Sequence, residues 1–261
     1  MSDAADVLLV EIVERHIALL TLNRPEARNA VNGALARAMA AAVTKVENDP
    51  DIWVAVLTGA GDGAFCAGVD LKEAAAGRAA EFETDEGGLA GFVRAPRTKV
   101  WIAAAQSHAL AGGLELLLAC DLAVVAQSAT FGLPEVRWGL IAGGGGVIRL
   151  PRTIPKRIAF EMIATAKPIP AADAQRYGLV NAVVPAAEVV AEALGLARRI
   201  CANAPLAVRE SLVLARRAAS PEETELWSLV ATATGRLSST ADWAEGPSAF
   251  TEKRAPRWAG Q

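Results

Sequence analysis

The stretch HALAGGLELLLACD, residues 108–121, combines a turn of small residues with a carboxylate in a leucine-rich run. Gly112 and Gly113 favour a tight turn, and residues 114–119 have strongly helix-forming composition, so the stretch predicts a turn that leads directly into a helix. Glu115 falls in the first turn of that helix, where unpaired N–H groups carry partial positive charge. Taken alone, the stretch slightly favours a solvent-facing glutamate that complements the helix dipole over a buried acid with a chemical role.

Strands and glycine turns around this stretch predict a parallel sheet. Residues 53–58 (WVAVLT) and 100–105 (VWIAAA) are short apolar runs typical of strands buried on both faces, and residues 122–126 form another short strand. A glycine-rich loop over 59–70 follows the first run, and a helix is expected to begin within 69–76. Two successive units of strand, glycine turn and helix indicate a right-handed βαβ arrangement with both loops at one end of the sheet, where α/β proteins bind ligands.

The two ends of the chain differ from this centre. Residues 7–13 and 17–22 predict a hairpin with His16 in its turn, and Asn32 is a good N-cap for a helix over 34–47. The fold class is therefore α/β for the first two thirds, followed by a mostly helical third. In that last third we expect helices at 155–165, 171–177, 186–203, 205–219 and 221–236, and one short strand at 179–184.

Composition and charge limit the classes of partner. The chain has 261 residues, 52% of them hydrophobic, and a net charge of -3 without any basic cluster, so we expect a substantial core and no nucleic-acid partner. Cys66, Cys120 and Cys201 form no Cys-x-x-Cys pair, so neither a disulfide framework nor a metal site is expected. The first 16 residues carry acids and no basic leader, and the apolar stretch 109–126 is interrupted by charges. These features predict a cytoplasmic protein without a membrane span.

Other glycine and histidine motifs do not match nucleotide or triad sites. GAGDG at 59–63 has the wrong spacing for a dinucleotide fingerprint, and GGGG at 143–146 lacks the Lys-Ser or Lys-Thr of a P-loop. Close packing at a turn is the simpler interpretation of the four glycines. His16 and His108 are the only histidines, and neither lies in a recognisable arrangement with a serine or cysteine, so a catalytic triad is not expected.

A second carboxylate of interest is Glu135, in the apolar context TFGLPEVRWGL. By itself it fits an ordinary acid at a helix start. A strand at 122–126 would return the chain so that Glu115 and Glu135 reach one cavity. Two carboxylates around one apolar cleft can hold different pKa values and divide acid and base duties.

Six motifs in order resemble the crotonase superfamily, and most closely its enoyl-CoA hydratases: NRPEARNAVN, AFCAGVDL, GGLELLLACD, FGLPEVRWGL, AQRYGLVNAVVP and EGPSAFTEKRAPRW. The resemblance covers residues 7–258. It implies a crotonase-like α/β core over residues 1–195, built from repeated ββα units that form two roughly perpendicular sheets. A helical C-terminal region over residues 196–261 would mediate a homotrimer or a dimer of trimers. The resemblance also implies an acyl-CoA thioester substrate and no cofactor beyond that CoA.

The resemblance further implies roles for individual residues. The backbone N–H groups of Val69 and Gly112 would form an oxyanion hole for the thioester carbonyl. Glu115 and Glu135 would hold the water that adds across the C2=C3 bond of a 2-enoyl-CoA, with Glu115 deprotonating the water and Glu135 handling the proton at C2. The residues implied in CoA binding are Arg28, Ala30, Ala67, Gly68, Asp70, Leu71 and Lys253.

Two departures and three alternatives accompany this interpretation. Ala111 stands where relatives usually have a first glycine. The run IAGGGG lacks the proline that many relatives have before the glycines, a change that bears on the acyl pocket, so the sequence does not predict the length of the acyl chain. An enoyl-CoA isomerase would use one carboxylate, and an acyl-CoA-binding protein without turnover would require neither acid. A dinucleotide oxidoreductase is disfavoured by the glycine spacing.

Overall fold

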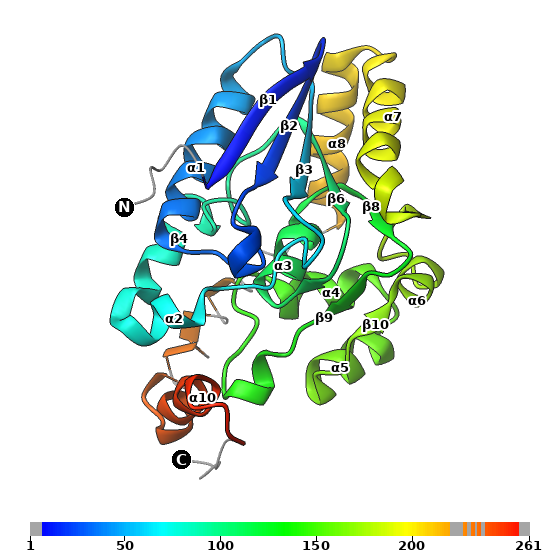
Figure 1. The fold of residues 1–261 in the computed structure, drawn as a ribbon. Coiled ribbons are helices and arrows are strands. Elements are labelled where there is room, and N and C mark those ends of the chain that lie inside the picture. The colour runs from blue at the N-terminus through cyan, green and yellow to red at the C-terminus, as the bar shows by residue number, and fades with distance from the viewer. Residues whose placement is uncertain (1–6, 220–226, 229–230, 233, 236–237, 256–261) are drawn as a thin grey trace.

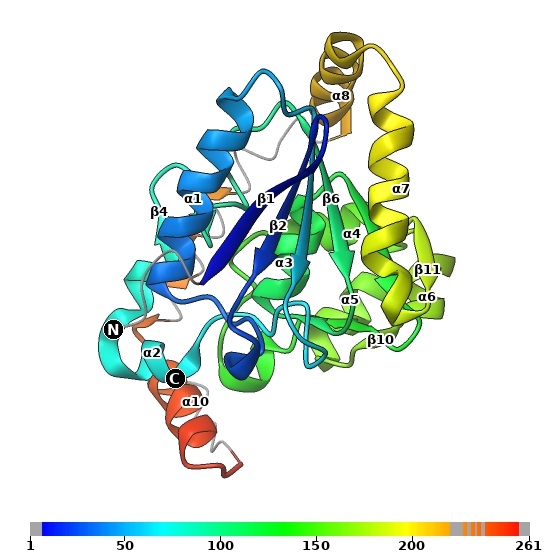
Figure 2. The same ribbon diagram turned by 45° about the horizontal axis from the view of Figure 1, so that its top comes forward.

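The computed structural model describes residues 7–219, 227–228, 231–232, 234–235 and 238–255. At its centre lies a six-stranded sheet with the strand order β1-β2-β3-β6-β8-β11 (Figures 1 and 2). β1 pairs antiparallel with β2, and the pairs that follow are parallel. The expected hairpin is confirmed. The strands are β1 (Leu8–Glu14), β2 (Ile17–Leu22), β3 (Val54–Gly59), β6 (Val100–Ala105), β8 (Leu122–Ala126) and β11 (Ala182–Val184).

The two central strands, β3 and β6, are buried along their whole length. They run parallel, with Thr58 opposite Ala104, so the loops that follow them leave the sheet at the same edge. The continuous apolar runs explain this burial, because a strand covered on both faces needs no polar alternation. The expected common loop edge is therefore confirmed, and it is here that the candidate site lies.

Helices α1 (Gly33–Asn48) and α7 (Val189–Cys201) pack against the sheet. α7 contacts β3, β6 and β8, and it lies alongside these strands in Figure 2. The predicted N-cap of α1 is confirmed, because the Asn32 side chain accepts a hydrogen bond from Leu35 N at 2.9 Å. At the other end of α1, Lys99 Nζ donates to the carbonyls of Val46 and Asp49, which would otherwise lack a partner in the helix.

Two smaller sheets position the loops at this edge. β7 (Ala109–Leu110), β9 (Thr130–Gly132) and β10 (Ile169–Pro170) form a three-stranded sheet, and β4 (Glu83–Thr84) pairs with β5 (Gly88–Leu89). β7 leads through Ala111 into α3 (Gly112–Ala119), the helix expected from the sequence. The three-stranded sheet therefore fixes the turn that precedes Glu115.

The segment after Asp70 is less regular than the sequence predicts. Within the helix expected to begin at 69–76, α2 (Leu71–Glu73) is followed by a π-helical turn, Ala74–Arg78, and a 3₁₀ helix, Ala79–Phe82. Gly77 has φ 81°, a left-handed conformation that ends regular helix geometry.

The last third is mostly helical, as expected. The helix expected at 221–236 falls largely outside the described residues, and the strand expected at 179–184 is shorter. α7 runs through the expected division between residues 195 and 196, so that division stays a prediction. Among the described residues, no helix is long and apolar enough to cross a membrane. The remaining helices are α4 (Gly146–Thr153), α5 (Lys156–Thr165), α6 (Ala171–Arg176), α8 (Pro205–Ala219) and α10 (Ala241–Thr251).

Candidate active site

Glu115 is buried inside the protein, with only 3% of its surface exposed. Its Oε1 accepts a hydrogen bond from Gly146 N at 2.8 Å. A Cβ added to Gly144 would lie 2.5 Å from Glu115 Oε2, so the chain there must be glycine to approach the carboxylate this closely. The alternative of a solvent-facing glutamate is therefore wrong, because the helix turns its acid toward the glycine run and not toward water.

The four glycines at 143–146 form a cradle for this carboxylate. Their interpretation as close packing at a turn is incomplete, because the N–H groups of Gly144 and Gly146 both favour the ionised form of Glu115. Burial acts in the opposite direction and is the larger effect, so it raises the pKa of Glu115 to about 7. The signal available in the sequence was the length of the glycine run, which exceeds what a turn needs.

Glu135 begins the 3₁₀ helix Glu135–Trp138 and is 9% exposed. Its Oε2 is buried without a hydrogen-bond partner among the described residues. Burial, and next the charge of Glu115, raise the pKa of Glu135 to about 8. Both acids line one cavity of about 490 Å³, so the expected meeting of the two carboxylates occurs in the structure.

Two backbone amides at the wall of this cavity are available to a ligand. Val69 pairs with Val31 in an isolated parallel bridge, in which Val31 N donates to Gly68 O at 2.7 Å and Asp70 N donates to Val31 O at 2.8 Å. This pattern leaves the N–H of Val69 on the side away from Val31. Gly112 begins α3, so its N–H has no acceptor within the helix. Within the described part of the chain, neither amide donates a hydrogen bond.

The two loops that carry these amides are packed against each other. A Cβ on Gly68, which has φ +102°, would lie 3.2 Å from Gly112 N, and a Cβ on Gly113 would lie 1.9 Å from Cys66 O. Ala111, directly before Gly112, has φ 52° and ψ -128°, a conformation that strains any residue with a Cβ. The close approach of the loops therefore depends on glycine at 68 and 113.

The residues expected to bind CoA divide into two groups. Leu71 lines the cavity beside Val69, whereas Arg28, Ala30, Ala67, Gly68 and Asp70 lie on the adjoining loops outside its wall. These loops are joined by hydrogen bonds, including one from Ala67 N to Arg28 O at 3.1 Å. Lys253 is exposed just beyond the end of α10 and does not line the cavity, although Pro247 of the same helix does.

Asp70 has a structural role in the loops expected to bind CoA. Its carboxylate forms an ion pair with Arg24 at 2.9 Å and accepts hydrogen bonds from Lys72 N and Glu73 N at the start of α2. Arg24 also donates to the carbonyl of Ala30. The carboxylate therefore ties the two candidate CoA loops together.

An apolar cavity of about 570 Å³ continues from the first one. Glu135, Leu140 and Ile141 line both cavities. Sequence reasoning did not identify the residues that close the first cavity from the C-terminal side, which are Trp227, Ala231, Thr234, Trp243 and Pro247.

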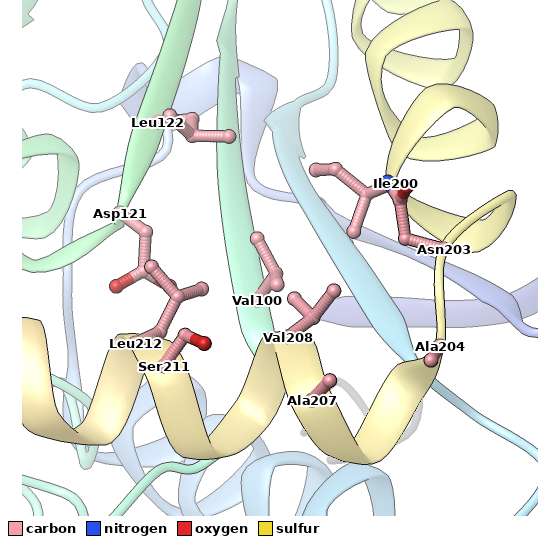
Figure 3. A pocket seen from close by; sticks show the side chains of 10 residues that line it. All are labelled: Val100, Asp121, Leu122, Ile200, Asn203, Ala204, Ala207, Val208, Ser211 and Leu212. Carbon is pink, nitrogen blue, oxygen red and sulfur yellow. The ribbon is translucent and has the colours of Figure 1, made fainter.

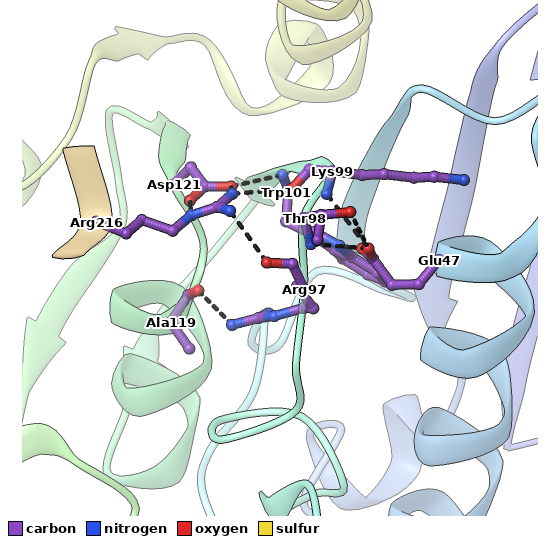
Figure 4. Close-up of polar contacts among 8 residues, drawn as sticks. All are labelled: Glu47, Arg97, Thr98, Lys99, Trp101, Ala119, Asp121 and Arg216. Carbon is purple, nitrogen blue, oxygen red and sulfur yellow. Dashed lines mark hydrogen bonds and ion pairs between the residues drawn. The ribbon is translucent and has the colours of Figure 1, made fainter. Parts of the chain in front are cut away.

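A further apolar cavity of about 470 Å³ lies at the opposite ends of the strands, between α8 and the strand residues Val100 and Leu122 (Figure 3). Its lining contains one carboxylate, Asp121, which is held by Arg216 at 2.8 Å (Figure 4). The cavity that holds Glu115 and Glu135 is therefore the one suited to acid and base chemistry.

The sequence pattern of the family described as enoyl-CoA hydratase/isomerase matches residues 13–261. The chain belongs to this family. The resemblance to the crotonase superfamily and the predicted crotonase-like α/β fold are thereby confirmed.

Known members of the enoyl-CoA hydratase/isomerase family resemble the chain over nearly its whole length. An enoyl-CoA hydratase of Mycobacterium tuberculosis is 40% identical over 254 residues, 95% of each chain. A carnitinyl-CoA dehydratase of Proteus mirabilis is 38% identical over 247 residues, 93% of this chain and 94% of the relative. A crystal structure of carnitinyl-CoA hydratase from Mycobacterium avium superposes with a TM-score of 0.92 at 45% identity, covering 98% of this chain and 99% of that one.

Proposed function

We propose that this enzyme adds water across the C2=C3 bond of a 2-enoyl-CoA thioester to give a 3-hydroxyacyl-CoA. Membership of the family and its hydratase and dehydratase relatives support a hydratase-type activity. The observation that carries the proposal is the pair of buried carboxylates, Glu115 and Glu135, in one cavity with two unpaired backbone amides. An acyl-CoA-binding protein without turnover would gain nothing from burying two acids together.

The surroundings of the two acids support a division of their roles. Glu115 accepts backbone N–H bonds, which favour its ionised form, whereas Glu135 has an unpartnered oxygen and lies near the charge of Glu115. These surroundings favour the ionised form of Glu115 and the protonated form of Glu135. Glu115 acts as the base that deprotonates water, and Glu135 acts as the acid that delivers a proton to C2.

The amides of Val69 and Gly112 support the electrostatic part of the reaction. Addition of hydroxide at C3 moves negative charge onto the thioester oxygen, and two N–H donors fixed at that oxygen stabilise the resulting enolate. A donor of this kind typically contributes about 3 to 4 kcal/mol to transition-state stabilisation. Both donors are main-chain groups, so substitution of the Val69 side chain would leave the chemistry in place.

The proposed substrate fits the arrangement of the candidate CoA loops beside the active-site cavity and of the apolar cavity beyond Glu135. The loops that carry Arg28 and Asp70 would bind CoA, with Lys253 approaching it from this subunit or a neighbouring one, and the apolar cavity beyond Glu135 would take the acyl chain. The reaction requires no cofactor beyond the CoA of the substrate, because water and two carboxylates supply every proton that moves.

We also propose a homotrimer or a dimer of trimers. Large apolar side chains of the helical region are exposed in the single chain, among them Leu206 at 70% and Phe250 at 41%. Such surfaces are typical of contacts between subunits. A cytoplasmic location stays a prediction.

The activity is tested with the wild-type enzyme on a panel of 2-enoyl-CoA thioesters of increasing chain length. Hydration removes the ultraviolet absorbance of the conjugated thioester, and the chain length with the highest kcat/KM would define the acyl pocket. The isomerase alternative is tested with 3-enoyl-CoA, from which it would generate the same absorbance. Retention of the absorbance across the panel, with normal CoA-thioester binding, would contradict the hydratase proposal and favour a binding protein.

A further inference from the structure

Leu89 presents an apolar side chain to the active-site cavity, the cavity that holds Glu115 and Glu135. It is the last residue of β5 and is 6% exposed. It lines the cavity together with Val69, Gly112 and both acids. The proposed hydration uses carboxylates and backbone amides, and it leaves this large apolar group without a role.

One methyl group of Leu89 contacts two of the glycine segments that form the site. A Cβ on Gly112 would lie 3.1 Å from Leu89 Cδ2, and a Cβ on Gly144 would lie 2.6 Å from the same atom. The Cβ on Gly144 would also lie 2.5 Å from Glu115 Oε2, so the methyl group and the carboxylate approach Gly144 from the same side. The methyl group therefore fills the place where the proposed oxyanion amide meets the glycine cradle of Glu115.

The backbone around Leu89 holds this side chain in place. Leu89 pairs with Glu83 in the hairpin of β4 and β5, and its carbonyl accepts a hydrogen bond from Phe92 N at 3.1 Å. A Cβ on Gly91 would lie 2.5 Å from Ala36 O, so the segment that follows β5 packs directly against α1. A buried side chain on a backbone anchored in this way forms a firm wall, because a close-packed interior yields little to a larger group.

We propose that Leu89 determines the specificity of the enzyme at C2 of the substrate, by excluding 2-enoyl-CoA thioesters with a branch at that atom. The inference rests on the proposed hydration. The thioester oxygen lies at the amides of Val69 and Gly112, and C3 lies at the water held by Glu115. C2 is the atom between these two positions, and the Leu89 methyl group borders both of them. A straight-chain substrate has only a hydrogen atom on C2, whereas a methyl branch would compete with Leu89 for the same space.

The volume of one methyl group sets the size of the effect. One methylene too many in an apolar pocket changes kcat/KM about 10-fold to 200-fold. Leu89→Ala removes an isopropyl group and therefore makes room for the branch. We expect the ratio of kcat/KM for the branched substrate to kcat/KM for the straight-chain substrate to be at least about tenfold higher in this variant than in the wild type.

The test measures this ratio for the full-length wild type and for Leu89→Ala, with 2-methyl-2-hexenoyl-CoA as the branched substrate and 2-hexenoyl-CoA as the straight one. Loss of the conjugated-thioester absorbance follows the reaction. Comparison of the two enzymes cancels the difference in intrinsic reactivity between the two thioesters. A ratio that rises at least about tenfold supports the assignment of Leu89, and an unchanged ratio overturns it.

Binding of saturated thioesters separates this inference from the hydratase proposal. Should the wild type hydrate neither substrate, which would contradict the proposed function, calorimetry with hexanoyl-CoA and 2-methylhexanoyl-CoA decides the role of Leu89 without turnover. The wild type should bind the branched thioester more weakly than the straight one, and Leu89→Ala should narrow that difference. Equal discrimination by both enzymes would overturn the proposal.

A matched control and a smaller substitution guard against effects on folding. Leu179→Ala removes the same atoms from a leucine that is also 6% exposed but lies outside the lining of the active-site cavity and of the apolar cavity beyond Glu135, so its ratio should equal that of the wild type. Should circular dichroism show that Leu89→Ala does not fold, Leu89→Val, which shortens the side chain by one methylene, decides the question. A raised ratio in Leu89→Val supports the assignment, and the wild-type ratio contradicts it.

Discussion

Replacement of Gly144 by alanine tests whether the glycine cradle fixes the position of Glu115. The new Cβ would lie 2.5 Å from Glu115 Oε2 and 2.6 Å from Leu89 Cδ2, closer than such atoms approach in proteins. Gly144 does not have a left-handed φ, so the added methyl group acts through contact and not through backbone strain. The carboxylate must move by roughly half an ångström or more, and the hydrogen bond from Gly146 N is lost or lengthened.

The expected result is a loss of rate with little loss of binding. Displacement of a catalytic group by about 1 Å reduces the rate about 100-fold, so we expect kcat to fall between about 10-fold and 100-fold. KM should change little, because Gly144 lies outside the loops proposed to bind CoA. Overpacking should also lower the free energy of unfolding by about 1 to 3 kcal/mol, measured by urea denaturation.

A matched control separates the cradle from the general effect of adding a methyl group. Gly195 lies in α7, where the nearest atoms to a new Cβ are 3.7 Å away, so Gly195→Ala should retain the wild-type kcat. It should also be slightly more stable, by about 0.5 to 1 kcal/mol, because alanine favours helix. Wild-type kcat in Gly144→Ala would refute the claim that the glycine run positions Glu115.

Three further substitutions test other parts of the site. Ala111→Gly should relieve the strain at φ 52° and raise the melting temperature by about 2 to 4 °C, with kcat preserved, as measured by thermal unfolding and the hydration assay. Glu135→Gln should make the protein more stable than the wild type at pH 8 but not at pH 4, because the raised pKa of this acid favours its protonated form in the folded state. The wild type therefore loses stability as pH rises from the unfolded pKa of about 4.5 through the folded pKa of about 8, and the glutamine variant does not. Equal stability of the variant and the wild type at pH 8 would contradict the burial of Glu135. Asp70→Asn breaks the ion pair with Arg24 and should raise KM severalfold with kcat nearly unchanged; a fall in kcat alone would place Asp70 in the chemistry and not in loop positioning.

Much of the scaffold could be predicted from local patterns in the sequence. The apolar runs that became β3 and β6, the hairpin closed at His16 and the cap at Asn32 each follow from a rule that acts over a few residues. The helix start expected within 69–76 is confirmed at Leu71, but its irregular continuation was not predicted, because composition alone does not reveal that Gly77 adopts a left-handed φ.

The candidate site was only partly predictable. The pair Glu115 and Glu135 and the amide of Gly112 could be proposed from the resemblance, but the surroundings from which we infer different roles for the two acids could not be predicted. Those surroundings come from the glycine run at 143–146 and from the burial of Glu135, both of which depend on contacts between segments distant in the sequence.

The central claim, that both buried carboxylates take part in the hydration of a 2-enoyl-CoA, is tested most directly by the kcat of Glu115→Gln and Glu135→Gln. Each variant keeps the shape of its side chain and removes the ability to exchange a proton, so we predict a fall in kcat of about 100-fold to 10,000-fold for each. Binding of a saturated acyl-CoA should remain close to that of the wild type. A variant that retains wild-type kcat would contradict the account of a two-carboxylate hydratase.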